Sequence, residues 1–389
     1  MSTILVKPVG DRCNLSCTHC FYHPELGGRC AVMEEATLAA MTRGFLAEGE
    51  SPTIFAWQGG EPTLAGIAFY RRALALQERF ARRGQTVVNA FQTNGVLLDR
   101  EWAEFFAEHR VLVGLSIDGP PDCHDPLRRT AEGGGSHAAA AAAWRALRRA
   151  GCAVNILCVV HAANRDHPER VYAHLTRELG AEYLQFIPCV EWAPEGGVEP
   201  YSLRPGEYGR FLAALFELWA AETERSVSVK LFDDLVLRLA GKPMRDCMHR
   251  DSCDSHLVVE ADGSVYPCDF FVTPDHRLGD INESAPEELR ATPQARAFRE
   301  QKSIERPGRC TECEHLDLCQ GGCRKFQRPG GAGEAEQYLC EDMLYFLTRC
   351  RPRLEQMAET IRRRWRQWDA AGGVRARTRP AQERKRRAR

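Results

Sequence analysis

Short apolar runs recur along the first half of the chain, and turn residues bound each of them. They are rich in β-branched residues, as buried strands are. The six runs cover residues 4–6, 53–57, 86–91, 111–117, 154–160 and 183–187. We predict a strand at each of these runs.

Amphipathic stretches separate the runs and indicate helices. They cover residues 34–48, 67–82 and 137–150, and we expect Ser136 to cap the third helix and Gly151 to end it. Alternating strands and helices favour a parallel sheet. Six such units are too few for a closed eight-stranded barrel. We therefore predict an α/β fold built on a partial (β/α)6 TIM-like barrel, with site residues at the C-terminal ends of its strands.

The pattern changes in the second half of the chain. A helix is expected at 205–224 and another at about 343–368, and most of the segment between them is rich in cysteine and poor in regular structure. Such a segment is typical of a domain that folds around metal centres. We expect a barrel over residues 1–235, a cysteine-rich domain over 236–354, and a helix end with a basic tail over 355–389. Residues 374–389 carry eight Lys or Arg and one Glu, which predicts disorder.

Composition narrows the class of protein. The chain has 389 residues, of which 44% are apolar and 27% charged, with a formal net charge of −1. These values exclude a wholly disordered chain and one drawn onto nucleic acid by bulk charge. No apolar run approaches the roughly 18 residues needed to span a bilayer, and the apolar stretch at the N-terminus is too short for a signal peptide. We expect a cytoplasmic protein.

The chain contains 17 cysteines, and they are clustered. A cytosol keeps thiols reduced, so this many cysteines indicates metal ligands. Cys13, Cys17 and Cys20 form a CxxxCxxC motif after the first predicted strand. Three thiolates can hold three irons of a [4Fe–4S] cluster and leave the fourth iron open to a small molecule. A zinc knuckle with His19 or His23 as fourth ligand is the alternative.

Two further motifs follow. Gly59, Gly60, Glu61 and Pro62 come directly after the second predicted strand, where glycines allow a close backbone approach and a carboxylate can pair with an ammonium group. Alone, this run also fits an ordinary turn. Eight cysteines in the second half equal two sites of four ligands, which suit two clusters or two four-thiolate zinc sites. They are Cys247, Cys253, Cys268, Cys310, Cys313, Cys319, Cys323 and Cys340.

These motifs together resemble a known family. CxxxCxxC followed by Phe21 and Tyr22, with GGEP after the next strand, is similar to the radical S-adenosylmethionine (SAM) enzymes, and the eight later cysteines resemble the SPASM domain of enzymes that modify peptides. The run Asp-Gly-Ser-Val-Tyr-Pro-Cys-Asp-Phe at 262–270 narrows the resemblance to the anaerobic sulfatase-maturating enzymes. So do the segments at 20–23, 155–160, 184–187 and 278–280. The resemblance runs from about residue 6 to about residue 354.

The resemblance implies cofactors and their ligands. Cys13, Cys17 and Cys20 would hold the cluster that binds SAM. Further SAM contacts would come from Gln58, Gly59, Gly60, Glu61, Ser116, Arg128 and Tyr22. Cys247, Cys253, Cys268 and Cys323 would hold a first auxiliary [4Fe–4S] cluster, and Cys310, Cys313, Cys319 and Cys340 a second. The other cysteines are expected to pack in the core, and they are Cys30, Cys123, Cys152, Cys158, Cys189 and Cys350.

The resemblance also implies a reaction. A 5′-deoxyadenosyl radical would take a β-hydrogen from a Cys or Ser in an unfolded sulfatase segment of the Cys/Ser-x-Pro-x-Arg type and lead to Cα-formylglycine. Asp269 corresponds to the proposed base, and Gln185 is a candidate substrate contact. A low-potential donor such as ferredoxin or flavodoxin would supply electrons. Two alternatives stay open: a maturase that forms thioether or carbon–carbon crosslinks in a ribosomal peptide, and a non-catalytic zinc or iron–sulfur interaction protein.

Overall fold

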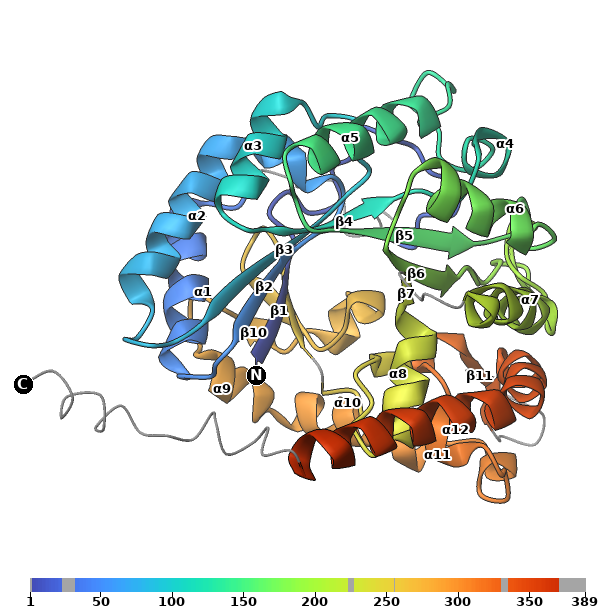
Figure 1. The fold of residues 1–389 in the computed structure, drawn as a ribbon. Coiled ribbons are helices and arrows are strands. Elements are labelled where there is room, and N and C mark those ends of the chain that lie inside the picture. The colour runs from blue at the N-terminus through green and yellow to red at the C-terminus, as the bar shows by residue number, and fades with distance from the viewer. Residues whose placement is uncertain (1, 23–31, 223–226, 255, 330–334, 371–389) are drawn as a thin grey trace, which may run out of the picture.

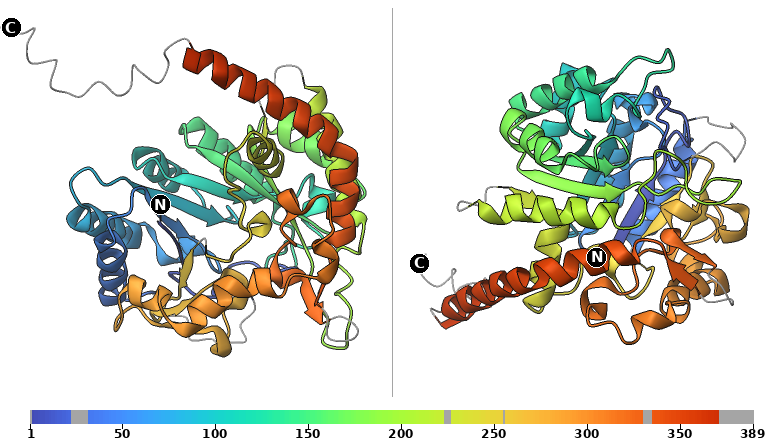
Figure 2. Two further views of the ribbon diagram at one scale, coloured as in Figure 1. Left: turned by 90° about the horizontal axis from the view of Figure 1, so that it is seen from below. Right: turned by 90° about the vertical axis from the view of Figure 1, so that its right-hand side faces the viewer.

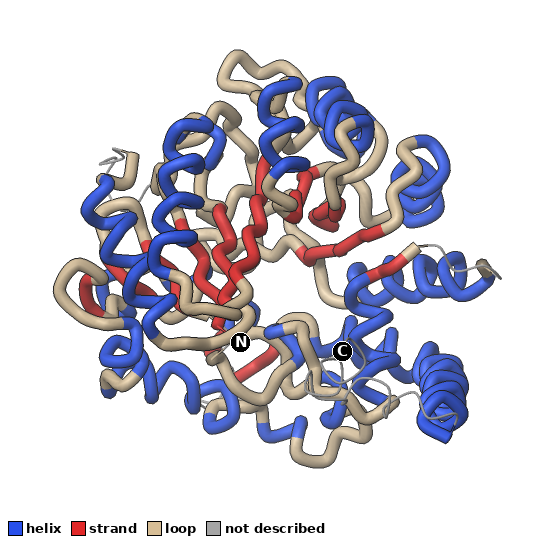
Figure 3. Tube along the Cα trace, turned by 60° about the vertical axis from the view of Figure 1, so that its left-hand side comes forward, coloured by secondary structure: helices blue, strands red, loops and turns tan. Residues whose placement is uncertain are grey.

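The structure is a computed structural model that describes residues 2–22, 32–222, 227–254, 256–329 and 335–370. The expectations for His23, Cys30 and the basic tail at 374–389 lie outside these residues. The described chain forms an α/β fold in which parallel strands curve inside a ring of helices, as Figure 1 and Figure 3 show.

All six predicted strands are present. They are β1 (Ser2–Val6), β2 (Thr53–Trp57), β3 (Val87–Thr93), β4 (Leu112–Ser116), β5 (Val154–Val160) and β6 (Tyr183–Pro188), and each pairs in parallel with the next. A short seventh strand, β7 (Ser228–Val229), extends the curve beyond β6. The predicted partial barrel of the α/β class is therefore confirmed.

Helices cover the outer face of this sheet. The barrel helices are α1 (Glu35–Ala47), α2 (Ile67–Phe80), α3 (Arg100–Glu108), α4 (Pro121–His124), α5 (His137–Arg149), α6 (Pro168–Ala173), α7 (Glu207–Ala221) and α8 (Lys230–Leu239). Aromatic side chains fill the space between α2, α3 and the strands. The ring centroids of Tyr70 and Phe91 lie 5.0 Å apart, and those of Phe91 and Phe106 lie 4.9 Å apart. Such packing makes this layer a rigid support for the strand ends.

The cysteine-rich part adds strands to the same sheet. β8 (Leu257–Val259) pairs in parallel with β1, and β9 (Ser264–Tyr266) and β10 (Gly279–Asp280) follow it as antiparallel strands, which gives a sheet of ten strands. Both views of Figure 2 place the orange segments of this part beside the blue N-terminal strands. They include α9 (Pro286–Arg290), α10 (Pro293–Ile304) and α11 (Leu316–Cys319), and a separate hairpin joins β11 (Gln327–Pro329) to β12 (Ala335–Gln337).

The last helix returns to the barrel. α12 (Cys340–Ala370) packs on α7 and α8, where the ring of Phe346 lies 6.1 Å from Phe216 and 5.6 Å from Phe232. It begins three residues before the predicted start and ends two after the predicted end. Among the described residues, no helix combines the length and apolar character that crossing a membrane requires.

One local prediction was wrong. Ser136 stands at the N-cap position of α5, but its side chain makes no capping hydrogen bond. Its hydroxyl instead donates to the carbonyl of Arg128, at 2.9 Å. Asp125 accepts from the N–H of His137, at 2.8 Å, and supplies the acceptor at this helix start. A tertiary contact has thus displaced the local cap.

Candidate active site

A cavity of about 250 Å³ opens at the C-terminal ends of the barrel strands. This is the end at which parallel barrels carry their site residues. The cavity brings together ten of the residues that the sequence singled out. They are Cys13, Cys17, Cys20, Tyr22, Gln58, Gly59, Gly60, Ser116, Arg128 and Asp269. Glu61 and Gln185 do not line it.

The three cysteines of the first motif converge on this cavity. Burial raises the pKa of Cys17 to about 11, and the neighbouring thiols of Cys20 and Cys13 add to the shift. The side-chain amide of Asn94, which follows β3, donates to the sulfur of Cys13 at 3.7 Å. Three neighbouring thiols on one loop, beside open space, fit a cluster that keeps one iron free for a further ligand.

The two glycines let the cluster loop and the end of β2 approach each other. A Cβ on Gly60 would lie 2.0 Å from the carbonyl oxygen of Arg12, so no other residue fits there without displacing the loop. The N–H of Gly60 donates to the carbonyl of Gly10 at 2.8 Å. Gln58 lines the same wall, and its buried amide nitrogen has no hydrogen-bond partner among the described residues. An unpartnered donor beside the thiols fits a polar ligand such as SAM.

Glu61 lies beneath the cavity. Its side chain is 1% exposed, and burial raises its pKa. It accepts hydrogen bonds from the hydroxyls of Thr63 (2.6 Å) and Thr93 (2.8 Å) and from the backbone N–H of Asn94 (2.8 Å). This carboxylate therefore joins the ends of β2 and β3 and fixes the segment that carries Gly59 and Gly60. Its expected contact with SAM stays a prediction.

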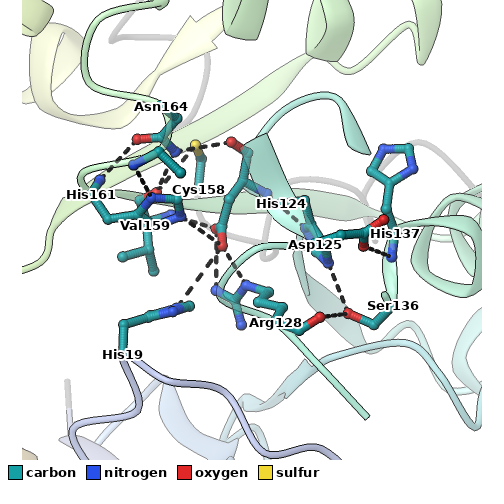
Figure 4. Close-up of polar contacts among 12 residues, drawn as sticks. His19, His124, Asp125, Arg128, Ser136, His137, Cys158, Val159, His161 and Asn164 are labelled. Atoms are coloured by element: carbon teal, nitrogen blue, oxygen red, sulfur yellow. Dashed lines mark hydrogen bonds and ion pairs between the residues drawn. The ribbon is translucent and has the colours of Figure 1, made fainter. Parts of the chain in front are cut away.

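A buried ion pair positions Arg128. Asp118, two residues after the end of β4, is fully buried and accepts a hydrogen bond from Nε of Arg128 at 2.5 Å. Figure 4 shows the polar contacts of Arg128 and its neighbours. Burial alone would raise the pKa of Asp118, but the Arg128 guanidinium, followed by His161 and His19, holds it well below its usual value. Asp118 also accepts from the N–H of Val159 at 2.8 Å. The carboxylate thus ties Arg128 to the ends of β4 and β5 while Arg128 lines the cavity.

Asp269 enters the cavity from the cysteine-rich part of the chain. Its Oδ1 lies 2.5 Å from Nζ of Lys7, the residue after β1. Nearby, the hydroxyl of Tyr22 donates to Glu260 at 2.6 Å. At the rim, Glu191 and Lys325 form an ion pair between the barrel and the cysteine-rich part. Gln185 lies in β6, two residues before Ile187, which does line the cavity, so alternation places both on the same face, with Gln185 farther from the rim.

Five of the polar groups around the cavity were not named as site residues from the sequence: Lys7, Asp118, Glu191, Glu260 and Lys325. Two of them had a usable signal, because Lys7 and Asp118 come directly after predicted strands, and strand ends form the rim. Glu260 follows a three-residue strand that was not predicted. Glu191 lies in a loop and Lys325 in the single 3-10 turn Arg324–Phe326, and neither setting gives a comparable signal in the sequence.

The eight later cysteines form two groups. Cys310, Cys313, Cys319 and Cys340 line a second cavity of about 330 Å³. In the other group, burial raises the pKa of Cys247 to about 12, and among its charged neighbours is Cys323. Cys323 also lies near Cys268 and Cys253. The grouping matches the two ligand sets that the resemblance implies. The donor sets consist only of sulfur and fit iron–sulfur clusters.

The remaining described cysteines are buried, as expected of core residues. They are Cys123, Cys152, Cys158, Cys189 and Cys350. Cys189 also lines the first cavity. Within the described ranges, no three His, Cys, Asp or Glu side chains are arranged to hold a single metal ion.

Comparison with known proteins gives the family. A profile of the radical SAM superfamily matches residues 8–175, and a profile of the SPASM iron–sulfur cluster-binding domain matches residues 247–314. A cysteine-type anaerobic sulfatase-maturating enzyme of Clostridium perfringens is 35% identical over 92% of this chain and 99% of its own. A serine-type enzyme of Bacteroides thetaiotaomicron is 31% identical over 92% of this chain and 91% of its own.

A solved structure agrees with these relatives. It is described as native anSMEcpe with bound AdoMet and Cp18Cys peptide, and it is 35% identical to this chain with a TM-score of 0.86. The match covers 92% of this chain and 99% of that one. The chain therefore belongs to the anaerobic sulfatase-maturating enzymes, which are radical SAM enzymes with a SPASM domain, and its cofactors are [4Fe–4S] clusters and SAM.

Proposed function

We propose that this protein oxidises a Cys or Ser side chain, in an unfolded sulfatase segment of the Cys/Ser-x-Pro-x-Arg type, to Cα-formylglycine. One observation carries the proposal: the carboxylate of Asp269 and the thiols of Cys13, Cys17 and Cys20 line the same cavity although about 250 residues separate them in the sequence. The proposed base and the proposed ligands of the SAM-binding cluster therefore face one space of about 250 Å³.

The reaction needs three acceptors. The substrate loses a hydrogen atom from Cβ, a proton from its thiol or hydroxyl group, and one further electron. A serine yields the aldehyde directly, and a cysteine yields a thioaldehyde that water converts to the aldehyde with release of hydrogen sulfide. When bound, SAM and the clusters supply the 5′-deoxyadenosyl radical and the outlet for the electron.

The residues of this chain would supply the rest. We assign the SAM-binding cluster to Cys13, Cys17 and Cys20. SAM contacts would come from Tyr22, Gln58, Gly59, Gly60, Ser116 and Arg128, which line the cavity. Arg128 is a fixed cation held by Asp118 and suits a carboxylate. Asp269 would accept the substrate proton. Gln185 and Glu61 do not line the cavity. Direct contact of Gln185 with the substrate and of Glu61 with SAM therefore has less support than the contacts assigned above.

The partners follow from the same chemistry. The substrate would be a sulfatase chain before it folds, because the cavity must admit a target residue with its neighbours. The electron donor would be a low-potential carrier of the ferredoxin or flavodoxin class. We place the reaction in the cytoplasm, where thiols stay reduced and clusters can be loaded.

The proposed function can be tested with anaerobically reconstituted protein, SAM, a reductant and a peptide that contains Cys-x-Pro-x-Arg, with a Ser-x-Pro-x-Arg twin. Mass spectrometry should show an aldehyde that forms in step with 5′-deoxyadenosine, and the twin identifies the target residue. Deoxyadenosine without peptide aldehyde would contradict the proposal and favour the crosslinking maturase.

The role of Asp269 has its own prediction. Asp269→Asn should keep its clusters and still cleave SAM, but it should lose at least about 100-fold of aldehyde formation, in the range of general-base effects. Asp275→Asn, a change at an exposed carboxylate of the same domain, should behave like the wild type. Wild-type aldehyde formation by Asp269→Asn would refute the assignment.

A further inference from the structure

A buried ammonium group lies beside the proposed base. Lys7 is 1% exposed, although a lysine rarely loses its water unless it is paired. Its Nζ lies 2.5 Å from Oδ1 of Asp269 and 3.4 Å from the ring centroid of Tyr22. The ring centroid of Phe21 lies farther away, at 5.9 Å. The Asp269 carboxylate and the face of Tyr22 therefore replace most of the water that Nζ has lost.

A second carboxylate lies at the hydroxyl end of Tyr22. Glu260 is 7% exposed and accepts the hydroxyl hydrogen of Tyr22 at 2.6 Å. It follows β8, and β8 pairs with β1 so that Val259 stands opposite Val6. Lys7 and Glu260 are thus the next residues on two paired strands. The ring of Tyr22 is held at its hydroxyl by Glu260 and carries Nζ of Lys7 on its face.

This arrangement crosses the junction between the two parts of the chain. Lys7 and Tyr22 belong to the barrel, whereas Glu260 and Asp269 belong to the SPASM part. The backbone N–H of Lys7 separately donates to the carbonyl of Val259 at 2.9 Å, so the strands are joined without the lysine side chain. The buried ammonium group is therefore not required for strand pairing, and its position against Asp269 needs another explanation.

We infer that Lys7 is a positioning residue for the oxidation, and that Tyr22 and Glu260 hold it so that it aims the carboxylate of Asp269 at the substrate. This inference rests on the proposed function. The ion pair uses Oδ1 of Asp269 and leaves Oδ2 as the oxygen that can accept the thiol or hydroxyl proton. It also fixes a side chain that would otherwise sample several rotamers at the cavity wall.

The test compares Lys7→Met with Lys7→Arg, because methionine keeps an unbranched chain without the charge and arginine keeps the charge. Each variant receives SAM, reductant and a peptide deuterated at Cβ of the target residue. Lys7→Met should retain iron, bind SAM and transfer deuterium to 5′-deoxyadenosine. Its yield of aldehyde per deoxyadenosine should fall at least tenfold, and Lys7→Arg should recover most of that loss.

Two further variants separate positioning from folding. If Lys7 acts through Asp269, adding Lys7→Met to Asp269→Asn should lower the aldehyde yield no further than Asp269→Asn does alone. Glu260→Gln keeps the ammonium group and weakens only its support, so its aldehyde yield per deoxyadenosine should fall a few-fold. This variant tests the inference even if Lys7→Met does not fold.

The outcomes against the inference are distinct from failure of the proposed function. A wild-type yield of aldehyde per deoxyadenosine in Lys7→Met overturns it, as does a parallel loss of deuterium transfer, which would place Lys7 in SAM or substrate binding. If Lys7→Met does not fold, a wild-type yield in Glu260→Gln overturns it. Absence of aldehyde from the wild-type protein itself would instead refute the proposed function.

Discussion

At the scale of single residues, His124 shows how a buried hydrogen-bond pattern fixes a protonation state. Its Nδ1 accepts the N–H of Asp118 at 3.1 Å, and its Nε2 lies 3.0 Å from the hydroxyl of Ser136. That hydroxyl donates its own hydrogen to the carbonyl of Arg128, so Nε2 of His124 must donate to the hydroxyl oxygen of Ser136. The ring is therefore neutral, and burial lowers its pKa from 6.5 to about 3.

This lowered pKa predicts a loss of stability in acid. The unfolded chain binds a proton at His124 below about pH 6.5, whereas the folded chain does not until about pH 3. The stabilisation is complete above pH 6.5 and falls as the pH drops toward 3, by about 2 kcal/mol at pH 5. We expect His124→Asn, whose Oδ1 can replace Nδ1, to reduce this difference.

Urea unfolding at pH 7 and pH 5 would measure it. The free energy of unfolding of wild type should fall by about 2 kcal/mol more than that of His124→Asn between the two pH values. Other groups titrate in both proteins and cancel in the comparison. Equal losses in the two proteins would mean that His124 accepts a proton in the folded state.

Much of the site could be predicted from the sequence, because several of its polar side chains stand at or just after the ends of predicted strands. Ten expected site residues line the cavity, including Gln58, Ser116 and Asp269. Glu61 was expected to contact SAM because its charge suits an ammonium group, and that contact stays a prediction; in the structure both of its oxygens accept hydrogen bonds from protein donors. A residue type shows what a side chain can bind, and only the fold shows which partners reach it first.

At the scale of elements, strands rich in β-branched residues were predicted well and very short ones were not. β2 and β5 have the predicted bounds, whereas β7, β8, β9 and β10 hold two or three residues each and give no periodic pattern. Their strand conformation depends on pairing with other strands. The partner of β8 is β1, about 250 residues earlier in the chain. The pairing of β8 with β1 is what brings Asp269 to the cavity.

The helices α7 and α12 pack closely against each other at Gly209. Gly209 lies within α7, and a Cβ there would stand 2.4 Å from the carbonyl oxygen of Asp342 in α12. Helix propensity alone favours Gly209→Ala by up to about 1 kcal/mol. We expect the steric contact to dominate, because α7 must move away from α12, and to destabilise the protein by about 1–3 kcal/mol.

If Cys340 is a ligand of the second auxiliary cluster, as the resemblance implies, the variant should also loosen that cluster, because Cys340 lies two residues before Asp342 at the start of α12. Thermal unfolding and iron content would report both effects. Gly134→Ala is the control, since its Cβ would meet only the hydroxyl of Thr130 at an ordinary 3.4 Å. A higher melting temperature for Gly209→Ala would show that propensity prevails and that the helices adjust freely.

At the scale of the whole molecule, the two sequence-defined parts share one sheet. Cysteine content suggested a boundary near residue 235, and profiles of two domains match on either side of it. Cysteine content shows where clusters can be bound, however, and it does not show which strands pair. In the structure β1 lies between β2 and β8, so the first strand of the barrel is an interior strand of a ten-stranded sheet.

This arrangement predicts that residues 1–235 do not form an independent barrel. Their isolation would leave β1 as an unpaired edge and would strip α12 from Phe216 and Phe232, which contact Phe346 in the full chain. An exposed apolar edge and helix face promote aggregation. We expect the 1–235 fragment to aggregate or to lose its cluster, whereas residues 1–370, which keep every described element, should load iron and bind SAM like the full chain. Size-exclusion chromatography, with iron and sulfide analysis, distinguishes an aggregated or cluster-free fragment from a folded one. A monomeric 1–235 fragment that holds one cluster and binds SAM would show that the barrel folds without β8 and α12.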